Sequence, residues 1–311
     1  MGYLEKKEPM NLLLQGDVGS GKTVVALIAL LTGVDNGCQT ALMAPTELLA
    51  EQHFLSILPF CEALNITIEL VTSSGTAKEK SLIRNGIENG TAQIIVGTHA
   101  LIQKKVEFSN LGLIVVDEQH RFGVLQRDAI SKKGLTPHVL IMTATPIPRS
   151  LALTLYGDMN ISFLDEFPPG RMPIETKLFY ENTRDTAYSL LEKEIKEGRQ
   201  AYVVCPLIEE SESIDLKAAI DVSNELQSRR LPNLIVQLIH GKLKKEERQT
   251  IMAEFKNGKI DVLVATTVIE VGIDVPNATV MLIEHAERFG LAQLHQLRGR
   301  VGRGKHASKC F

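Results

Sequence analysis

The sequence predicts an α/β protein of two successive domains, each a mostly parallel sheet flanked by helices. Short apolar runs alternate with helix-length amphipathic segments along the chain, which is the pattern of βαβ units. The chain has 311 residues, more than a single hydrophobic core usually holds, so two domains are expected. The densest proline cluster, Phe167–Pro173, is the candidate linker. We therefore place the domains at residues 1–168 and 169–311.

Five apolar runs in the first half have the length and composition of buried parallel strands. They are Leu12–Leu14, Thr40–Met43, Ile94–Val96, Leu113–Val116 and Val139–Met142. After the first run, the stretch Thr23–Leu31 predicts a helix. The alternation restarts beyond the proline cluster, and four further strands are expected at Ala201–Cys205, Leu234–His240, Val262–Ala265 and Val280–Ile283.

Composition narrows the class of protein without identifying it. The net charge is −3, so the overall balance neither indicates nor excludes a nucleic-acid partner. No stretch reaches 18 consecutive apolar residues and the first residues contain no apolar signal core, so we expect a cytoplasmic protein with no membrane span. The four cysteines, Cys38, Cys61, Cys205 and Cys310, form no C-x-x-C pair, which predicts reduced structural thiols.

A glycine-rich segment between the first strand and the first helix fits the phosphate-binding pattern G-x-x-x-x-G-K-[ST]. The segment reads Gly16, Asp17, Val18, Gly19, Ser20, Gly21, Lys22 and Thr23. Its glycines let backbone N–H groups curl around phosphate oxygens, and the following helix adds partial positive charge. Lys22 would then reach the β- and γ-phosphates and Thr23 would hold Mg²⁺. The alternative is a chance glycine turn in front of a helix.

Polar clusters follow the other strands, at the edge of a parallel sheet where ligands bind. Asp117 closes one buried strand and is a candidate Mg²⁺ ligand, and Glu118 beside it could orient or deprotonate an attacking water. Without the phosphate-binding loop, the same pair would be an acidic loop after a strand. Arg300 and Arg303 are three residues apart on a predicted last helix, where both could stabilise charge on a γ-phosphate.

Six segments together resemble the ATPase motor of superfamily-two helicases, and within it the RecG family of bacterial branched-DNA helicases. They are Gln15–Thr23, Ala44–His53, Asp117–Val124, Thr143–Arg149, Thr266–Pro276 and Gln293–Arg303. The resemblance covers nearly the whole chain and implies two tandem RecA-like (P-loop NTPase) domains. It also implies use of ATP and Mg²⁺ and hydrolysis coupled to movement along DNA.

The resemblance assigns roles to individual positions. It implies that Lys22 and Thr23 bind phosphate and Mg²⁺, that Asp117 binds Mg²⁺, that Glu118 is the catalytic base, and that Arg300 and Arg303 are arginine fingers with Gln296 near the γ-phosphate. Gly272 and Asp274 would bind the nucleotide, with Asp274 contacting the sugar. The residues that would couple hydrolysis to lobe movement are Gln119, His120, Thr143 and Thr145. Those that would contact the DNA backbone are Pro45, Thr46, Thr98, Gly241 and Thr267. Each of these five could instead be a helix cap or a turn.

The resemblance therefore predicts a monomeric, nucleoid-associated motor that acts on stalled replication forks and Holliday junctions. The family's wedge domain and C-terminal element have no counterpart between Met1 and Phe311, so we expect a fragment holding the two motor lobes. The motor of the transcription-repair coupling factor Mfd is one alternative, but that family tends to carry a second glutamate where this chain has Gln119. A nucleotide-dependent switch is another, although no N-K-x-D segment is present. A nucleotide-binding scaffold that does not hydrolyse is a third, which the intact set of catalytic residues disfavours.

Overall fold

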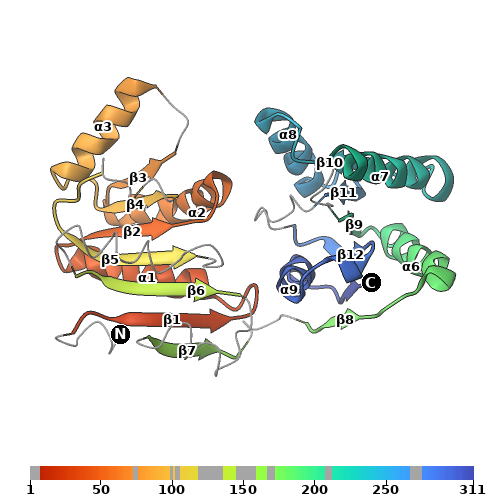
Figure 1. Ribbon diagram of the computed structural model, residues 1–311, viewed down its shortest axis with the longest axis horizontal. Coiled ribbons are helices and arrows are strands. Elements are labelled where there is room, and N and C mark those ends of the chain that lie inside the picture. Colours follow the sequence, from red (N-terminus) through yellow and green to blue (C-terminus); the bar gives the residue numbers. More distant parts are fainter. Residues whose placement is uncertain are drawn as a thin grey trace. The chain divides into compact units, whose positions relative to one another are not determined.

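Two compact α/β units make up the chain, Met1–Phe167 and Pro168–Phe311, which we call unit 1 and unit 2 (Figure 1). The computed structural model describes residues 8–72, 76–98, 101, 106–117, 136–144, 159–166, 172–206, 212–266 and 275–311. Within these residues every strand pairing is parallel, which confirms the predicted fold class. None of the helices in these residues has both the length and the apolar composition of a membrane span.

The described part of unit 1 contains a seven-stranded sheet in the order β3-β4-β2-β5-β6-β1-β7. Its strands are β1 (Asn11–Gly16), β2 (Gln39–Met43), β3 (Ile68–Val71), β4 (Ile94–Gly97), β5 (Leu111–Asp117), β6 (His138–Thr143) and β7 (Asn160–Leu164). All five predicted strands are present. The sequence missed β3 and β7, which form the two edges of the sheet and are only partly buried (Figure 1). Edge strands need no continuous apolar run, so their sequences give a weak signal.

Three helices of unit 1 are described, α1 (Lys22–Asp35), α2 (Glu47–Leu64) and α3 (Ala77–Glu88). The start of α2 is fixed by Thr46, whose hydroxyl accepts a hydrogen bond from the backbone N–H of Leu49 at 3.3 Å. Helix α3 begins with a capping box formed by Thr76 and Glu79. The helix predicted at Thr23–Leu31 is α1, which continues four residues further to Asp35.

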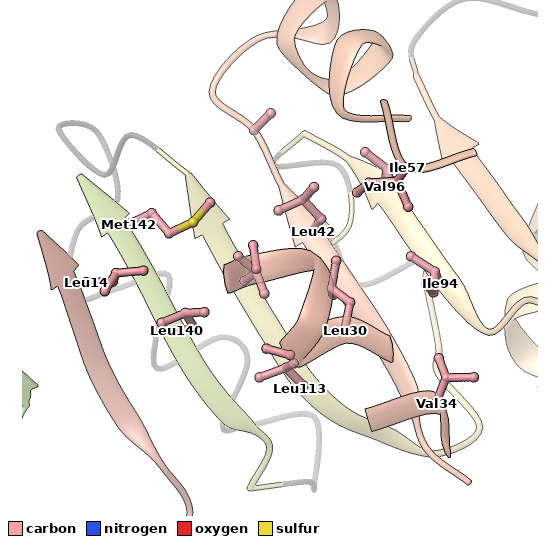
Figure 2. Packing of buried hydrophobic residues seen from close by; sticks show 14 of the residues in the cluster. Leu14, Leu30, Val34, Leu42, Ile57, Ile94, Val96, Leu113, Leu140 and Met142 are labelled. Carbon is pink, nitrogen blue, oxygen red and sulfur yellow. The ribbon is translucent and has the colours of Figure 1, made fainter. Parts of the chain in front are cut away.

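Helices α1 and α2 cover the same face of this sheet. Leu30 and Val34 of α1 pack with the strand residues Leu42 and Leu113 in one buried cluster (Figure 2). Ile57 of α2 belongs to the same cluster. Ile87 of α3 packs in a second cluster with the alternate residues of the same strands, Ile95, Ile114 and Ile141. The central strands are therefore buried on both faces, which explains why their sequences are continuously apolar.

Unit 2 contains, in its described residues, a six-stranded sheet in the order β10-β11-β9-β12-β13-β8. Its strands are β8 (Ile174–Thr176), β9 (Gln200–Val204), β10 (Val236–Ile239), β11 (Val262–Ala265), β12 (Ala278–Ile283) and β13 (Ser308–Cys310). Its helices are α6 (Arg184–Lys196), α7 (Glu212–Glu225), α8 (Lys245–Lys256) and α9 (Leu291–Arg298), with short helical turns at Glu181–Thr183 (η3), Leu226–Arg230 (η4) and Ala286–Arg288 (η6). The four predicted strands are present, and the two missed strands, β8 and β13, have three residues each.

The predicted last helix ends earlier than expected, and this corrects one prediction. Helix α9 stops at Arg298, Gly299 is its C-cap, and Gly302 has a φ of +77°, a conformation that interrupts a right-handed helix. Arg300 and Arg303 therefore lie in the turn after α9, where the spacing argument for a shared helix face does not apply. The Arg303 Nε donates to the carbonyl of Gly299 at 3.1 Å and closes this turn.

The two units repeat one hydrogen-bond pattern around a buried glutamine. Gln39 opens β2 and Gln200 opens β9, and each side-chain amide donates to one carbonyl near a helix end and one just before a neighbouring strand. The acceptors are Ile87 and Ala92 for Gln39 (3.0 and 2.7 Å), and Phe255 and Ile260 for Gln200 (2.6 and 2.7 Å).

An asparagine completes the pattern in each unit. Asn110, before β5, donates from Nδ2 to the carbonyl of Gly37 at 3.0 Å, and Asn277, before β12, donates to that of Gly198 at 3.0 Å. Both units therefore follow one architectural plan, in which β5 corresponds to β12 and the helix before β2 corresponds to the helix before β9.

The hydrophobic clusters of both units contain cysteine side chains. All four cysteines are free, as the sequence predicted, and Cys61, Cys205 and Cys310 are buried. Burial raises the pKa of the Cys205 thiol to about 12 and that of the Cys310 thiol to about 11. These thiols are therefore protonated and packed as small apolar groups.

Candidate nucleotide-binding site

The predicted phosphate-binding loop joins β1 to α1. Gly19 and Gly21 have φ values of +76° and +95°, which side chains other than glycine rarely adopt. Gly16 is required for a different reason, because a Cβ there would stand 2.5 Å from the Ser20 Oγ and 2.9 Å from the Leu164 Cβ. The loop is closed by the N–H of Ser20, which donates to the carbonyl of Asp17 at 3.1 Å.

Lys22 places its charge inside this loop. The residue is buried, and its Nζ donates to the carbonyls of Gly16 at 2.7 Å and Asp17 at 2.8 Å. Thr23 follows in the first turn of α1 and is exposed. The positive end of α1 and the ammonium of Lys22 therefore point to one small region, which suits an anion.

Asp117 is the last residue of β5, as predicted, and its carboxylate contacts α2. The Asp117 Oδ2 lies 2.8 Å from the Nε2 of His53, and both side chains are largely buried. Because an ionised carboxylate only accepts hydrogen bonds, Nε2 carries the proton of this bond. The sequence segment that carried the family resemblance included His53, but no role followed from it.

Strand register brings the predicted residues of unit 1 to one edge of the sheet. Asp117 on β5 pairs with Met142 on β6, so Thr143 lies one position beyond. Gln15 on β1 pairs with Thr143, and the phosphate-binding loop begins one residue later. The ends of β1, β5 and β6 therefore gather the loop, the carboxylate of Asp117 and the buried Thr143 at the carboxyl edge.

These residues fit ATP and Mg²⁺. The Ser20 Oγ is buried without a hydrogen-bond partner at the loop, a polar atom that a bound phosphate or its metal would satisfy. No group of three or more His, Cys, Asp or Glu that could form a metal site occurs among the described residues. Thr23 and Asp117 would thus supply only part of a metal shell. Mg²⁺ in nucleotide sites usually takes its other ligands from the phosphates and from water.

Four of the five predicted DNA-contacting residues are described, and they lie in or beside caps and turns. Thr46 caps α2, Pro45 precedes it, and the carbonyl of Thr98 accepts from the N–H of Leu101 at 3.0 Å. Gly241 lies in an exposed turn after β10. Thr46 is therefore a helix cap, and a cap or turn is compatible with a phosphate contact.

Seven predicted site residues lie outside the described residues. They are Glu118, Gln119, His120, Thr145, Thr267, Gly272 and Asp274. The three predicted γ-phosphate residues of unit 2, Gln296, Arg300 and Arg303, are described and partly buried. Gln296 lies on α9, and the two arginines follow it.

In unit 2 an arginine pairs with the carboxylate that corresponds to Asp117. Asp117 lies seven residues after Asn110, and Glu284 lies seven residues after Asn277, so the two acids occupy equivalent positions. The Arg184 Nη2 lies 3.0 Å from the Glu284 Oε1, and the Tyr188 hydroxyl donates to the same oxygen. Sequence reasoning missed this cluster, because its partners are about 100 residues apart in the chain.

The fold and this site define a class of protein, a P-loop protein with two RecA-like domains. The family model for DEAD/DEAH box helicases matches residues 3–154, and the model for the helicase conserved C-terminal domain matches residues 183–305. Dbp5 of S. cerevisiae, solved with RNA and ADP BeF3, is 21% identical with a TM-score of 0.69, over 99% of this chain and 80% of that chain. That likeness concerns the fold alone.

Closer relatives identify the family. The ATP-dependent DNA helicase RecG of Synechocystis sp. is 53% identical over 308 residues, 99% of this chain and 37% of the relative. RecG of Bacillus subtilis is 53% identical over 97% of this chain and 44% of the relative. A structure of RecG bound to a three-way DNA junction has a TM-score of 0.78 and 46% identity, covering 100% of this chain and 40% of that chain.

The chain belongs to the RecG family of helicases. It spans about two fifths of the length of the curated relatives it matches. These matches favour RecG over the Mfd alternative.

Proposed function

We propose that this chain is the ATP-hydrolysing motor of a helicase that acts on branched DNA, including stalled forks and Holliday junctions. The observation that carries the proposal is the meeting of the phosphate-binding loop and Asp117 at one edge of the unit 1 sheet. The relatives are named ATP-dependent DNA helicases, and one was solved on a three-way DNA junction. The two lobes of the motor would be residues 1–168 and 169–311.

Nucleotide binding would begin at the loop. The backbone N–H groups of the loop, at positions Gly16, Asp17, Gly19, Ser20 and Gly21, would surround the phosphates of ATP. Lys22 has three N–H bonds, and a phosphate would accept one of them alongside or in place of the loop carbonyls. In unit 2, Gly272 and Asp274 are proposed to complete nucleotide binding.

Thr23 and Asp117 would hold Mg²⁺, which when bound neutralises charge on the β- and γ-phosphates. Glu118 would orient a water and accept its proton as the water attacks the γ-phosphorus. The bond between the γ-phosphorus and the bridging oxygen breaks, which releases ADP and phosphate. Arg300 and Arg303, with Gln296, would stabilise the charge that spreads over the γ-phosphoryl group.

Coupling and DNA contact would use the same strand ends. Gln119 and His120 are proposed to act with Thr143 and Thr145 to transmit hydrolysis to lobe movement. The small residues Pro45, Thr46, Thr98, Gly241 and Thr267 would line the DNA backbone, where threonine hydroxyls and backbone N–H groups would contact phosphates without reading sequence. We propose that the motor works as a monomer in the bacterial cytoplasm, on the DNA of the nucleoid.

The test is the steady-state rate of ATP hydrolysis, measured with and without a forked DNA duplex. We expect a slow rate that forked DNA stimulates, and its loss in Glu118→Gln and Lys22→Ala. Loss of a positioned charge commonly lowers turnover by about 10²-fold or more. Glu88→Gln, which changes an exposed carboxylate at the end of α3, is the matched control and should retain the wild-type rate.

Two outcomes would overturn the proposal. Hydrolysis that survives both Glu118→Gln and Lys22→Ala would come from another protein or another site. Turnover of GTP in preference to ATP, with no response to DNA, would support a nucleotide-dependent switch instead.

A further inference from the structure

The contact between His53 and Asp117 is built into the core of unit 1. His53 lies on α2 between Ala50 and Ile57, at spacings of three and four residues, so all three share one face of the helix. Ala50 and Ile57 are fully buried in the cluster that covers the sheet, and Figure 2 shows Ile57 there. The position of the imidazole is therefore fixed by the packing of α2.

An imidazole on an apolar helix face needs a specific explanation. Burying a polar ring costs free energy unless its N–H finds a partner, and a leucine would pack on this face without that cost. The partner of the His53 Nε2 is the Asp117 Oδ2 at 2.8 Å. The same bond restrains the carboxylate, which stands at the end of β5 and would otherwise rotate about its side-chain torsions.

We propose that His53 is a positioning residue that holds the Asp117 carboxylate in the orientation that binds Mg²⁺. This inference rests on the proposed ATPase function. The hydrogen bond occupies Oδ2, so Oδ1 would be the oxygen that binds the metal, and hydrogen bonds orient ligating carboxylates in this way in other metal sites. In unit 2 the equivalent carboxylate, Glu284, is instead held by Arg184.

The readout is the Mg²⁺ concentration at half-maximal binding of ATP, measured by calorimetry with the ATP concentration held constant. Loss of a partner that orients a metal ligand commonly weakens metal binding 10- to 100-fold. We therefore expect His53→Leu to raise the Mg²⁺ midpoint by roughly 10-fold or more. ATP binding in EDTA should be unchanged, because Lys22 and the loop contact the phosphates without His53.

Three variants separate positioning from folding. His53→Gln retains an N–H donor at a similar reach and should restore most of the wild-type Mg²⁺ midpoint. Ile57→Val removes one methyl group from the same helix face, so it should lower stability slightly and leave the midpoint unchanged. His53→Met, which also lacks a donor, replaces His53→Leu if circular dichroism shows that the leucine variant does not fold.

The outcomes distinguish this inference from the proposed function. Equal Mg²⁺ midpoints in the wild type and the folded donor-less variant would overturn the role of His53. Equal loss in His53→Gln and His53→Leu would also overturn it, because packing alone would then explain both. If the wild-type chain binds no ATP with or without Mg²⁺, the proposed function itself fails.

Discussion

At the residue scale, His138 ties the start of β6 to the chain that enters β1. The N–H of Met10 donates to the His138 Nδ1 at 2.8 Å, and the N–H of Val139 donates to the Met10 carbonyl at 2.7 Å. Burial lowers the pKa of the His138 imidazole, because the charged form is poorly solvated there. Nδ1 can accept this hydrogen bond only while it carries no proton.

The His138 contact predicts a pH-dependent stability. The pKa is lower in the folded state, so the unfolded chain binds the proton more readily, and the stabilisation is full above about pH 6.5 and declines as the pH falls below it. In His138→Asn, the Oδ1 can accept from Met10 without titrating. We expect the free energy of unfolding in urea to fall more steeply between pH 7.5 and 5.5 for the wild type than for this variant. Parallel curves for the two proteins would contradict the prediction.

Some residues of the nucleotide site contact their neighbours in the sequence, whereas others contact residues that are far away in the chain. Lys22 and Thr23 were predictable, because the loop is one contiguous segment whose backbone makes the site. Asp117 was predictable from its place at the end of an apolar run. The partner of Asp117 was not, because His53 is 64 residues away and meets it only after α2 packs on the sheet. A histidine between apolar positions at helical spacing was the one available signal.

At the element scale, burial decides which strands the sequence reveals. The central strands are covered on both faces and read as apolar runs, whereas β3 and β7 are half-buried edges. Strands β8 and β13 have three residues each, too few for any periodic pattern. The end of α9 was misplaced for a different reason, since glycines at Gly299 and Gly302 stop the helix inside a segment otherwise compatible with one.

The repeated glutamine predicts matched effects in the two units. Replacing Gln39 or Gln200 with leucine removes the side-chain donor of the buried Ala92 or Ile260 carbonyl, which costs roughly 1–3 kcal/mol for an unsatisfied group. The other acceptor in each unit, the carbonyl of Ile87 or Phe255, still accepts from a backbone N–H. We expect both variants to lower the free energy of unfolding in urea by similar amounts. Gln93→Ala, which loses a contact with the N–H of Thr67 at the surface, should cost less. A large effect in one unit only would show that the two glutamines differ in importance.

Helix α2 joins two proposed sites, since Thr46 caps its start and His53 contacts Asp117 from its second turn. A phosphate bound at Thr46 would act on Asp117 through this one rigid element, and such coupling between sites is reciprocal. We expect forked DNA to lower the Mg²⁺ midpoint for ATP binding in the wild type and in Ile57→Val, but not in His53→Leu. An equal shift in His53→Leu would place the coupling in another element.

At the scale of the whole molecule, the proposed chemistry is divided between the two units. The phosphate-binding loop and Asp117 belong to unit 1, and Gln296, Arg300 and Arg303 belong to unit 2. The sequence alone suggested this division, because the two motif groups fall on either side of the proline cluster. Hydrolysis would then depend on both units, whereas nucleotide affinity would depend mainly on unit 1.

This division predicts a separation of ATP binding from ATP hydrolysis. Arg300→Ala and Arg303→Ala should retain ATP affinity but lose DNA-stimulated hydrolysis, because an arginine finger acts on charge that develops only in the transition state. Lys22→Ala should lose both. Calorimetry and a steady-state phosphate-release assay measure the two quantities, and Arg288→Ala, an exposed arginine of unit 2, is the control.

Arg303 requires one further control, because its Nε also closes the turn after α9 by donating to the carbonyl of Gly299 at 3.1 Å. Arg303→Lys retains a positive charge but cannot reproduce the planar guanidinium, so it should recover part of the stability and little of the hydrolysis. A variant in which hydrolysis recovers together with stability would mean that Arg303 supports the turn, leaving Arg300 to act on the phosphate. If Arg300→Ala or Arg303→Ala lost as much ATP affinity as Lys22→Ala, the proposed separation of binding from hydrolysis would be wrong. Unit 1 alone would then not suffice to bind the nucleotide.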